Sequence, residues 1–380
     1  MLKYHILFLL VPFVCFSQKK ETWVDKPMSE WPQIALTNHV QFKNGDRYID
    51  ASFAYAGTGF LIDTGKDTLA ATAKHVLWIA KNNKSSAVQL NDYLGKWVMK
   101  SKGDARDSVL IDRLINEDST EILEGPSSTI TERDWIIFSL SRNSSNTYPL
   151  KPRYTALSPD EKVYVLSCAY TTSNCTAMEG KLLRKEGMDL LLNMAGKNLP
   201  GSSGSPVIDA NGYLIGILSS TTMDNTTGKS ISVAISTEYL YNVLHEKQGY
   251  NNPKKDYGEL LLKTVLDKGA KEAVKLYQNL IKNPKNFYNY NLRSSNRNGL
   301  REVGKKLIEM NRVEDAVEIL KLNAAMNSSF FINHNLLAKA YVMSGNKKEA
   351  IKSYRLSMEK YDNKDRNEAY RELKSLIEKE

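Results

Sequence analysis

The sequence predicts a multidomain protein in which an all-β region is followed by an all-α helical-repeat region. Two observations support this prediction. Short apolar segments alternate with turn residues over residues 30–246, with almost no long amphipathic pattern among them. From residue 256 onward the apolar residues recur at helical spacing, and part of that pattern repeats after 34 positions.

The first 17 residues have the composition of a signal peptide. Lys3 precedes an apolar core over residues 6–16, and Cys15 and Ser17 are small residues at positions −3 and −1 of a cleavage after Ser17. A buried strand or a short anchor helix is the alternative, but the run is too short to span a bilayer comfortably. We therefore expect a signal peptide over residues 1–17 and an exported protein, periplasmic or secreted, with no stable membrane span after cleavage.

Residues 30–246 are expected to form one β-rich domain. Hairpin turns are expected at Glu186–Gly187 and Asn211–Gly212, because glycine tolerates the positive φ that tight turns require. Many short strands with this punctuation indicate a barrel or a sandwich. The expected strands are rich in Val, Ile, Tyr and Phe and cover residues 51–62, 68–73, 96–99, 109–114, 135–140, 162–169, 180–184, 188–193, 205–208, 213–219 and 231–235.

A polar stretch over residues 247–255, with Gly249 and Pro253, predicts a linker, and the charge balance changes after it. The formal net charge of +9 comes entirely from the last third of the chain. A basic region can attract nucleic acid or an anionic membrane. Here, however, lysine alternates with glutamate at helical spacing, which indicates solvated helix faces. We expect no nucleic-acid partner.

Residues 256–380 are expected to form helical repeats. Two copies align at a constant offset of 34, pairing Val303, Leu307, Asn311, Ala316, Val317, Leu320 and Ala324 with Leu337, Tyr341, Gly345, Ala350, Ile351, Tyr354 and Met358. This is the period of the tetratricopeptide helix–turn–helix unit, and a weaker third copy covers residues 257–283. Unrelated amphipathic helices are the alternative. Such repeats offer a concave face to a peptide or protein partner, or they dock on the preceding domain.

Chemistry is concentrated in the glycine-rich segment Gly-Ser-Ser-Gly-Ser-Pro at residues 201–206. A serine hydroxyl is a poor nucleophile, so it needs a base, a group that orients the base, and donors for the oxyanion. His75 lies in a Thr-Ala-Lys-His-Val segment that follows an apolar strand, and Asp134 directly precedes another apolar run. Each segment alone is compatible with a surface loop, a packed histidine or a turn aspartate.

Taken together, the order His75, Asp134, Ser203 in a β-rich frame resembles the trypsin-like, chymotrypsin-fold serine peptidases, and most closely their bacterial members. The resemblance covers roughly residues 35–245. It implies two six-stranded β-barrels with the site between them, His75 on the first and Ser203 on the second. It further implies Ser203 as nucleophile, His75 as general base and acid, Asp134 as its orienting partner, and the amides of Gly201 and Ser203 as the oxyanion hole.

Some positions depart from the family pattern. Ser202 stands where many digestive relatives carry an aspartate that pairs with a newly cut N-terminus, so we expect no such activation. Ser205 stands where a glycine is usual. Lys197 would lie near the floor of the specificity pocket and favour an acidic substrate side chain, unless it sits on a mobile loop. Ser219 and Ser220 would line the pocket wall.

The sequence thus favours an exported serine endopeptidase whose helical repeats bind a protein or peptide. An inactive peptidase-like scaffold and an esterase with the same triad are the alternatives. Two cysteines, Cys168 and Cys175, remain after signal cleavage; in an oxidising compartment they either pair across a short hairpin or stay separate. Two cysteines alone make no metal site, and we expect neither a metal nor a cofactor.

Overall fold

A computed structural model defines the conformation of most of the chain. The residues that the structure describes are 20–42, 55–76, 88–89, 94–116, 122–123, 133–194, 200–224, 227–246, 255–283, 286–292, 299–360, 371–372 and 375–376. The expected signal peptide and all but the last residue of the expected linker therefore lie outside the described residues. No helix in the described part of the chain is long and apolar enough to cross a membrane.

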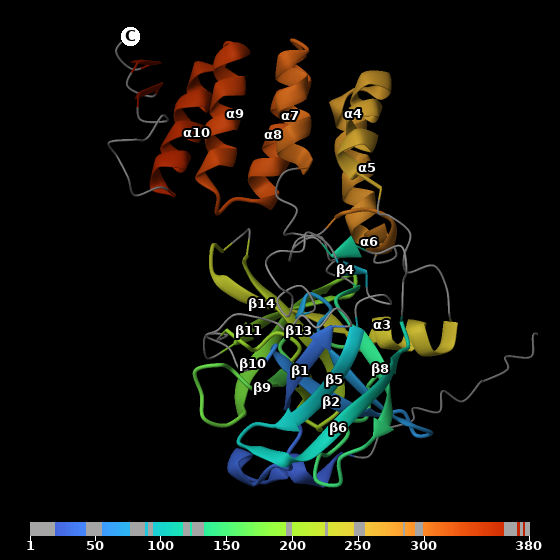
Figure 1. Ribbon diagram of the computed structural model, residues 1–380. Coiled ribbons are helices and arrows are strands. Elements are labelled where there is room, and N and C mark those ends of the chain that lie inside the picture. The colour runs from blue at the N-terminus through green and yellow to red at the C-terminus, as the bar shows by residue number, and fades with distance from the viewer. Residues whose placement is uncertain are drawn as a thin grey trace, which may run out of the picture.

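The β region forms two closed, antiparallel six-stranded barrels, as the sequence resemblance implied (Figure 1). The first barrel has the strand order β1-β2-β3-β8-β6-β5 and the second the order β10-β11-β14-β13-β12-β9. The first comprises β1 (Leu36–Phe42), β2 (Thr58–Asp63), β3 (Thr68–Thr72), β5 (Leu94–Ser101), β6 (Asp104–Leu114) and β8 (Ile136–Arg142), with β4 (Val88–Gln89) and β7 (Ile122–Leu123) as a separate pair. The second comprises β9 (Lys162–Ser167), β10 (Thr176–Glu186), β11 (Asp189–Met194), β12 (Pro206–Asp209), β13 (Leu214–Met223) and β14 (Ser230–Ser236).

Several strands are apolar on both faces because each lies between two cores. On β2, Leu61 packs inside the first barrel, whereas Phe60 packs in a core between the barrels. On β8, Phe138 lies inside the barrel and Ile137 in the shared core. Burying each such side chain contributes roughly 1.5–3 kcal/mol. The shared core therefore fixes one barrel against the other, which a site built from both barrels requires.

Strand β1 was not expected from the sequence, and the expected strand 51–62 begins only at Thr58. Strand β1 is difficult to predict because it contains polar residues that are buried. Asn38 is fully buried; its side chain donates hydrogen bonds to the carbonyl of Ala56 and to Thr72 Oγ1 and accepts one from Trp97. A buried polar side chain is tolerated in a strand when its hydrogen bonds are satisfied. Alternation of apolar residues alone does not reveal such a strand.

The expected hairpin turns occur where the sequence placed them. Gly187 has φ +62° between β10 and β11, and Gly212 has φ +86° between β12 and β13. Two short 3-10 helices, Thr22–Asp25 and Met28–Glu30, precede β1, and α3 (Thr237–Tyr241) with a π-helical turn (Asn242–Glu246) follows β14.

After the barrels the described chain forms seven helices, in agreement with the predicted all-α region (Figure 1). Asn311 and Gly345, which occupy matching positions of the two aligned copies, both have positive φ at the turn between paired helices. Ala316 and Ala350, a second matched pair, are both fully buried. The helices are α4 (Tyr257–Lys268), α5 (Ala270–Lys282), α6 (Asn286–Asn289), α7 (Gly299–Glu309), α8 (Val313–Met326), α9 (Phe331–Met343) and α10 (Lys347–Glu359).

Candidate active site

Strand pairing brings His75 and Asp134 together although they are far apart in the sequence. Thr72 at the end of β3 pairs with Ile136 at the start of β8. His75 follows the end of β3 and Asp134 precedes β8, so both residues lie at the same edge of the first barrel. The amide of His75 donates to Asp134 Oδ1 at 2.8 Å, and His75 Nδ1 lies 2.7 Å from Asp134 Oδ2.

Ser203 reaches this edge from the second barrel. Its Oγ lies 2.9 Å from Nε2 of His75, and the amide of Thr58 on β2 donates to its carbonyl oxygen at 2.8 Å. The close approach depends on Gly204: a Cβ there would lie 2.1 Å from the carbonyl oxygen of Thr58 and 2.3 Å from Thr72 Oγ1. Only glycine permits this contact, so the residue after Ser203 seats the serine against the first barrel.

The three side chains thus form a continuous hydrogen-bonded chain. Asp134 is almost completely buried, and the His75 side chain is 13% exposed. An ionised carboxylate only accepts, so Nδ1 of His75 carries the proton and donates to Asp134. In the neutral imidazole, Nε2 then has a free lone pair and accepts a hydrogen bond from the hydroxyl of Ser203. This is the arrangement in which a serine hydroxyl can be deprotonated as it attacks.

Burial and charge shift the pKa values of His75 and Asp134 in opposite directions. Burial alone would lower the pKa of His75, but the charge and hydrogen bond of Asp134 outweigh it and raise that pKa above its ordinary value. For Asp134, burial would raise the pKa, but His75 and the hydrogen bonds from His75 and Ser219 hold it below the ordinary carboxyl value. The site therefore favours a carboxylate beside an imidazole that readily accepts a proton.

Ser219 lines the pocket next to Ser203, as expected, but it also makes a contact that was not expected. Its hydroxyl donates to Asp134 Oδ2, and the residue is buried at the β-bulge between Leu218 and Ser220 of β13. Sequence reasoning placed it only on the pocket wall and missed this bond; the one signal for it was a serine directly after the apolar run of β13. Ser219 thus completes the set of donors around the buried carboxylate.

A pocket of about 220 Å³ adjoins Ser203. It lies between the loop before β12 and strand β13, and small hydroxyl-bearing residues make up much of its wall. Both Ser219 and Ser220 line it, as expected, together with Pro200, Gly201, Ser202, Ser203, Leu218 and Thr221. Lys197 lies outside the described residues, so its place at the pocket floor stays a prediction.

Gly201 and Ser203 border the same pocket, as the oxyanion-hole prediction requires. Gly201 has φ +94°, a conformation that glycine adopts without strain. Ser202 between them is buried, and the hydroxyl of Ser167 on β9 donates to its hydroxyl at 2.7 Å. A buried, neutral pair of serines therefore lies directly before the nucleophile position.

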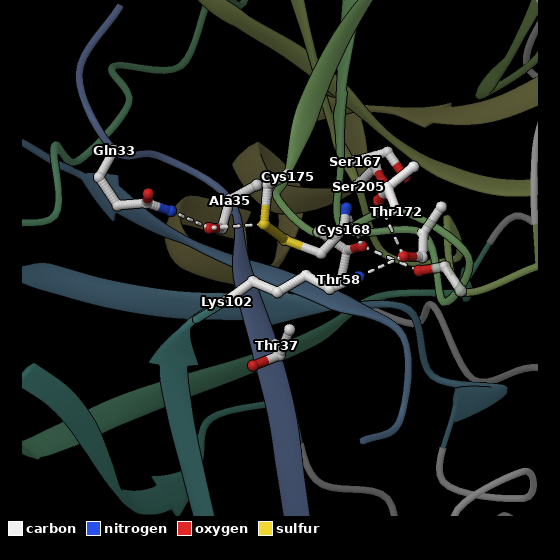
Figure 2. The surroundings of a disulfide bond; sticks show 12 residues. Gln33, Ala35, Thr37, Thr58, Lys102, Ser167, Cys168, Thr172, Cys175 and Ser205 are labelled. Carbon is white, nitrogen blue, oxygen red and sulfur yellow. Dashed lines mark hydrogen bonds between the residues drawn. A yellow bond between two sulfur atoms is a disulfide. The ribbon is translucent and has the colours of Figure 1, made fainter. Parts of the chain in front are cut away.

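The two remaining cysteines are joined: Cys168, directly after β9, and Cys175, directly before β10, form a disulfide (Figure 2). It closes the loop between these strands. Among the described residues, no group of three or more His, Cys, Asp or Glu side chains could hold a metal ion.

Comparisons with known proteins gave a family match and similar solved structures. Residues 57–217, the part that carries all three residues of the hydrogen-bonded chain, match the model of a family described as a trypsin-like peptidase domain. Among solved structures the chain is similar to the Rv3671c protease from M. tuberculosis in its active form, with 15% identity and a TM-score of 0.38, over 67% of this chain and 97% of that one. A search of curated proteins finds no match. The tetratricopeptide resemblance of the later helices stays a prediction.

Proposed function

We propose that this chain, which contains a trypsin-like peptidase domain, is an active serine endopeptidase that works through Ser203, His75 and Asp134. The observation that carries the proposal is the unbroken chain of hydrogen bonds, 2.9 Å from Ser203 to His75 and 2.7 Å from His75 to Asp134. An inactive scaffold has no need to keep a nucleophile, a base and an orienting carboxylate in this alignment.

The reaction follows from the geometry. Ser203 Oγ attacks the carbonyl carbon of the substrate while its proton passes to Nε2 of His75. Asp134 stabilises the imidazolium that forms, and the amides of Gly201 and Ser203 stabilise the negative oxygen of the tetrahedral intermediate. His75 then gives the proton to the leaving amine, which leaves an acyl group on Ser203. Water, deprotonated by His75, attacks this ester and releases the second product.

We expect the enzyme to act without release of a new N-terminus. In relatives with an aspartate before the nucleophile, a freed α-amino group pairs with it. Here Ser202 is bonded to the hydroxyl of Ser167, so this position offers no carboxylate with which a freed α-amino group could pair. The mature protein should therefore be active as folded, and a form that stays inert until it is clipped would contradict this expectation.

We further propose that the protein is exported, to the periplasm or the medium, and that its helical region binds a protein or peptide. The Cys168–Cys175 disulfide supports export, because disulfides persist in oxidising compartments. The matched helix–turn–helix copies support the binding role, since stacked repeats expose an extended concave surface.

A fluorophosphonate probe, which phosphonylates an activated serine, tests the proposed activity. Mature protein should be labelled and should cleave a peptide library, and Ser203→Ala should abolish labelling and lower kcat by at least about 10⁴-fold. Ser158→Ala, at an exposed serine before β9, is the matched control and should keep wild-type labelling. A correctly folded wild-type protein that takes up no probe would sink the proposal and favour the scaffold. If the probe labels the protein, and the protein hydrolyses esters but not peptides, the result would favour an esterase.

A further inference from the structure

An oxyanion hole is made of peptide groups, and the orientation of each N–H is tied to its own carbonyl. In a trans peptide the N–H and C=O bonds point in opposite directions, and all peptides of the described chain are trans. The amides of Gly201 and Ser203 belong to the peptides 200–201 and 202–203. Whatever binds the carbonyl oxygens of Pro200 and Ser202 therefore directs the two N–H groups toward the pocket.

The two carbonyls are held from different places. The Ser202 carbonyl accepts from the amide of Ser205 at 3.0 Å and from its hydroxyl at 2.6 Å. Both donors belong to Ser205 in the same short turn, so the orientation of the Ser203 N–H is set by residues that are near in the sequence. The Pro200 carbonyl instead accepts from the amide of Tyr170 at 2.9 Å. Tyr170 lies in the loop between β9 and β10, far away in sequence.

The ring of Tyr170 reinforces the same contact. A Cβ on Gly201 would lie 2.8 Å from the amide nitrogen of Tyr170 and 2.9 Å from its ring, so the ring packs directly on the Gly201 backbone. The Tyr170 hydroxyl accepts a hydrogen bond from the amide of Gly57 at 3.2 Å. Gly57 in turn lies against the Ser203 backbone. One residue thus joins the oxyanion peptide to both barrels.

The loop that carries Tyr170 is held firmly. The Cys168–Cys175 disulfide closes it, and the amide of Cys168 donates to Thr58 Oγ1 at 3.0 Å (Figure 2). The same Thr58 hydroxyl donates to the carbonyl of Gly201 at 2.9 Å. Thr58 therefore links the loop to the carbonyl of Gly201, on the other side of Gly201 from the Pro200 carbonyl.

Two side chains from the first barrel, Tyr55 and Lys102, form hydrogen bonds with carbonyl oxygens of the loop. The Tyr55 hydroxyl lies 2.9 Å from the carbonyl oxygen of Cys168 and 3.0 Å from that of Ala169. Lys102 donates to the Tyr55 hydroxyl at 2.7 Å and to the Ala169 carbonyl. Because a hydroxyl has one proton, Tyr55 donates to one carbonyl at a time while it accepts from Lys102.

We propose that the disulfide-closed loop 168–175 is the positioning element of the oxyanion hole: Tyr170 holds the Pro200–Gly201 peptide so that the Gly201 N–H faces the substrate oxygen. Tyr170 is thus a positioning residue, acting through Gly201. This inference rests on the proposed peptidase function. It assigns to the loop the task that the buried carboxylate and freed N-terminus perform in other members of the fold.

The test compares binding of a transition-state mimic with binding of substrate. A peptide aldehyde forms a hemiacetal with Ser203 whose oxygen occupies the oxyanion hole, whereas KM reports mainly ground-state contacts. Tyr170→Pro removes the amide donor, and the double variant Cys168→Ala/Cys175→Ala keeps the amide but opens the loop. In both, kcat and aldehyde affinity should fall together by about 10- to 100-fold, below the 10²–10³ typical of losing an oxyanion donor outright, while KM changes little.

Graded variants separate positioning from folding. Tyr170→Ala should show the same signature through loss of the ring contact, and Tyr170→Phe, which keeps ring and amide, should recover most of kcat. Tyr154→Ala, at a tyrosine packed on Tyr241 of α3, is the matched control and should behave as wild type. If Tyr170→Pro does not fold, as judged by its melting curve, Tyr170→Ala and the double cysteine variant decide the matter.

The possible failures are distinguishable. If the wild-type protein takes up no fluorophosphonate, the proposed function is wrong. If it is labelled and active, but every folded variant of Tyr170 and of the two cysteines keeps wild-type kcat and aldehyde affinity, the loop does not position the hole and the inference is overturned. A rise in KM without loss of aldehyde affinity would also overturn it, since that pattern indicates a substrate contact instead.

Discussion

The two barrels contribute to the site in different ways. The first supplies side chains: His75 and Asp134 are bonded to each other at 2.7 Å before any substrate arrives. The second supplies one side chain, Ser203, and the backbone around it, including the positive φ of Gly201. The acid–base half of the site is therefore set by residue identity, whereas the electrostatic half is set by the direction of peptide groups.

This difference bears on how each half fails. A side-chain function is lost when its atoms are removed, and the loss should be large and pH-dependent. A backbone function survives most substitutions at its own position and fails when the contacts that orient it are removed. Variants that affect the His75–Asp134 pair should therefore change the pH profile, and variants of the backbone around Ser203 should change kcat without moving that profile.

Among the variants that test this contrast, the largest effect is expected from Asp134→Asn in the first barrel. The amide no longer fixes the protonated Nδ1 of His75, and by analogy with other serine peptidases kcat should fall by about 10⁴-fold. The pH profile should move as well. In the wild type Asp134 raises the pKa of His75 above 6.5, so kcat/KM should fall as the pH drops through a value above 6.5. Without that charge, burial lowers the pKa of His75, and the fall should shift to lower pH. An unshifted profile would show that another group governs the acid limb.

Gly201→Ala tests the second barrel at its own backbone. Its φ of +94° and its contact with Tyr170 leave no room for a Cβ, so the peptide must rotate away from the productive orientation. We expect kcat to fall by about 10²–10³-fold with little change in KM and no shift of the pH profile. Gly65→Ala is the matched control, because Gly65 has φ +81° in the turn between β2 and β3 with nothing within 4 Å of its Cβ position. The control should lose some stability but keep its activity; an equal loss of kcat in both variants would refute the orientation argument.

The same contrast explains how much of the molecule could be predicted from its sequence. The three key residues could be predicted because side-chain identity reveals them: a histidine after one apolar strand, an aspartate before another and a serine among glycines. Most strands were found for the same reason. The two-barrel fold followed from the resemblance to trypsin-like peptidases that these three segments establish. Strand β1 was missed, since Asn38 is polar yet fully buried, and its hydrogen-bond partners come from three other parts of the chain.

What remained hidden depends on contacts between distant segments. Nothing in the residues around Tyr170 indicates that its amide binds the Pro200 carbonyl, because every residue but proline carries that amide. The bond from Ser219 to Asp134 was hidden for a related reason, since serine is common in strands and only the fold places this one beside a buried carboxylate. Sequence patterns predict which groups a site contains more readily than what holds them in place.

A smaller effect is expected from Ser219→Ala, where the second barrel reaches into the first. The variant removes one of the hydrogen bonds to the buried carboxylate of Asp134. A bond to a charged group contributes about 1.5–3 kcal/mol, and if half of this acts on the transition state, kcat/KM should fall by about 3- to 13-fold. The pKa of Asp134 should rise, and steady-state kinetics across pH measure both effects. Ser158→Ala serves again as the control, and wild-type kinetics in Ser219→Ala would show that the bond is dispensable.

The smallest effect on activity is expected at the buried serine pair of the second barrel. Ser202→Ala leaves the hydroxyl of Ser167 without its acceptor, which should cost about 1–3 kcal/mol of stability, whereas replacing both serines by alanine should be nearly neutral. Urea unfolding followed by tryptophan fluorescence isolates this effect, because all five tryptophans precede the helical region. Neither variant should alter the pH profile or kcat strongly, since the Ser202 carbonyl stays bound to Ser205. If the double variant instead loses as much unfolding free energy as the two single variants together, the two hydroxyls act independently and do not form a coupled pair. A large fall in kcat would show that side chains, as well as peptide groups, set the second half of the site.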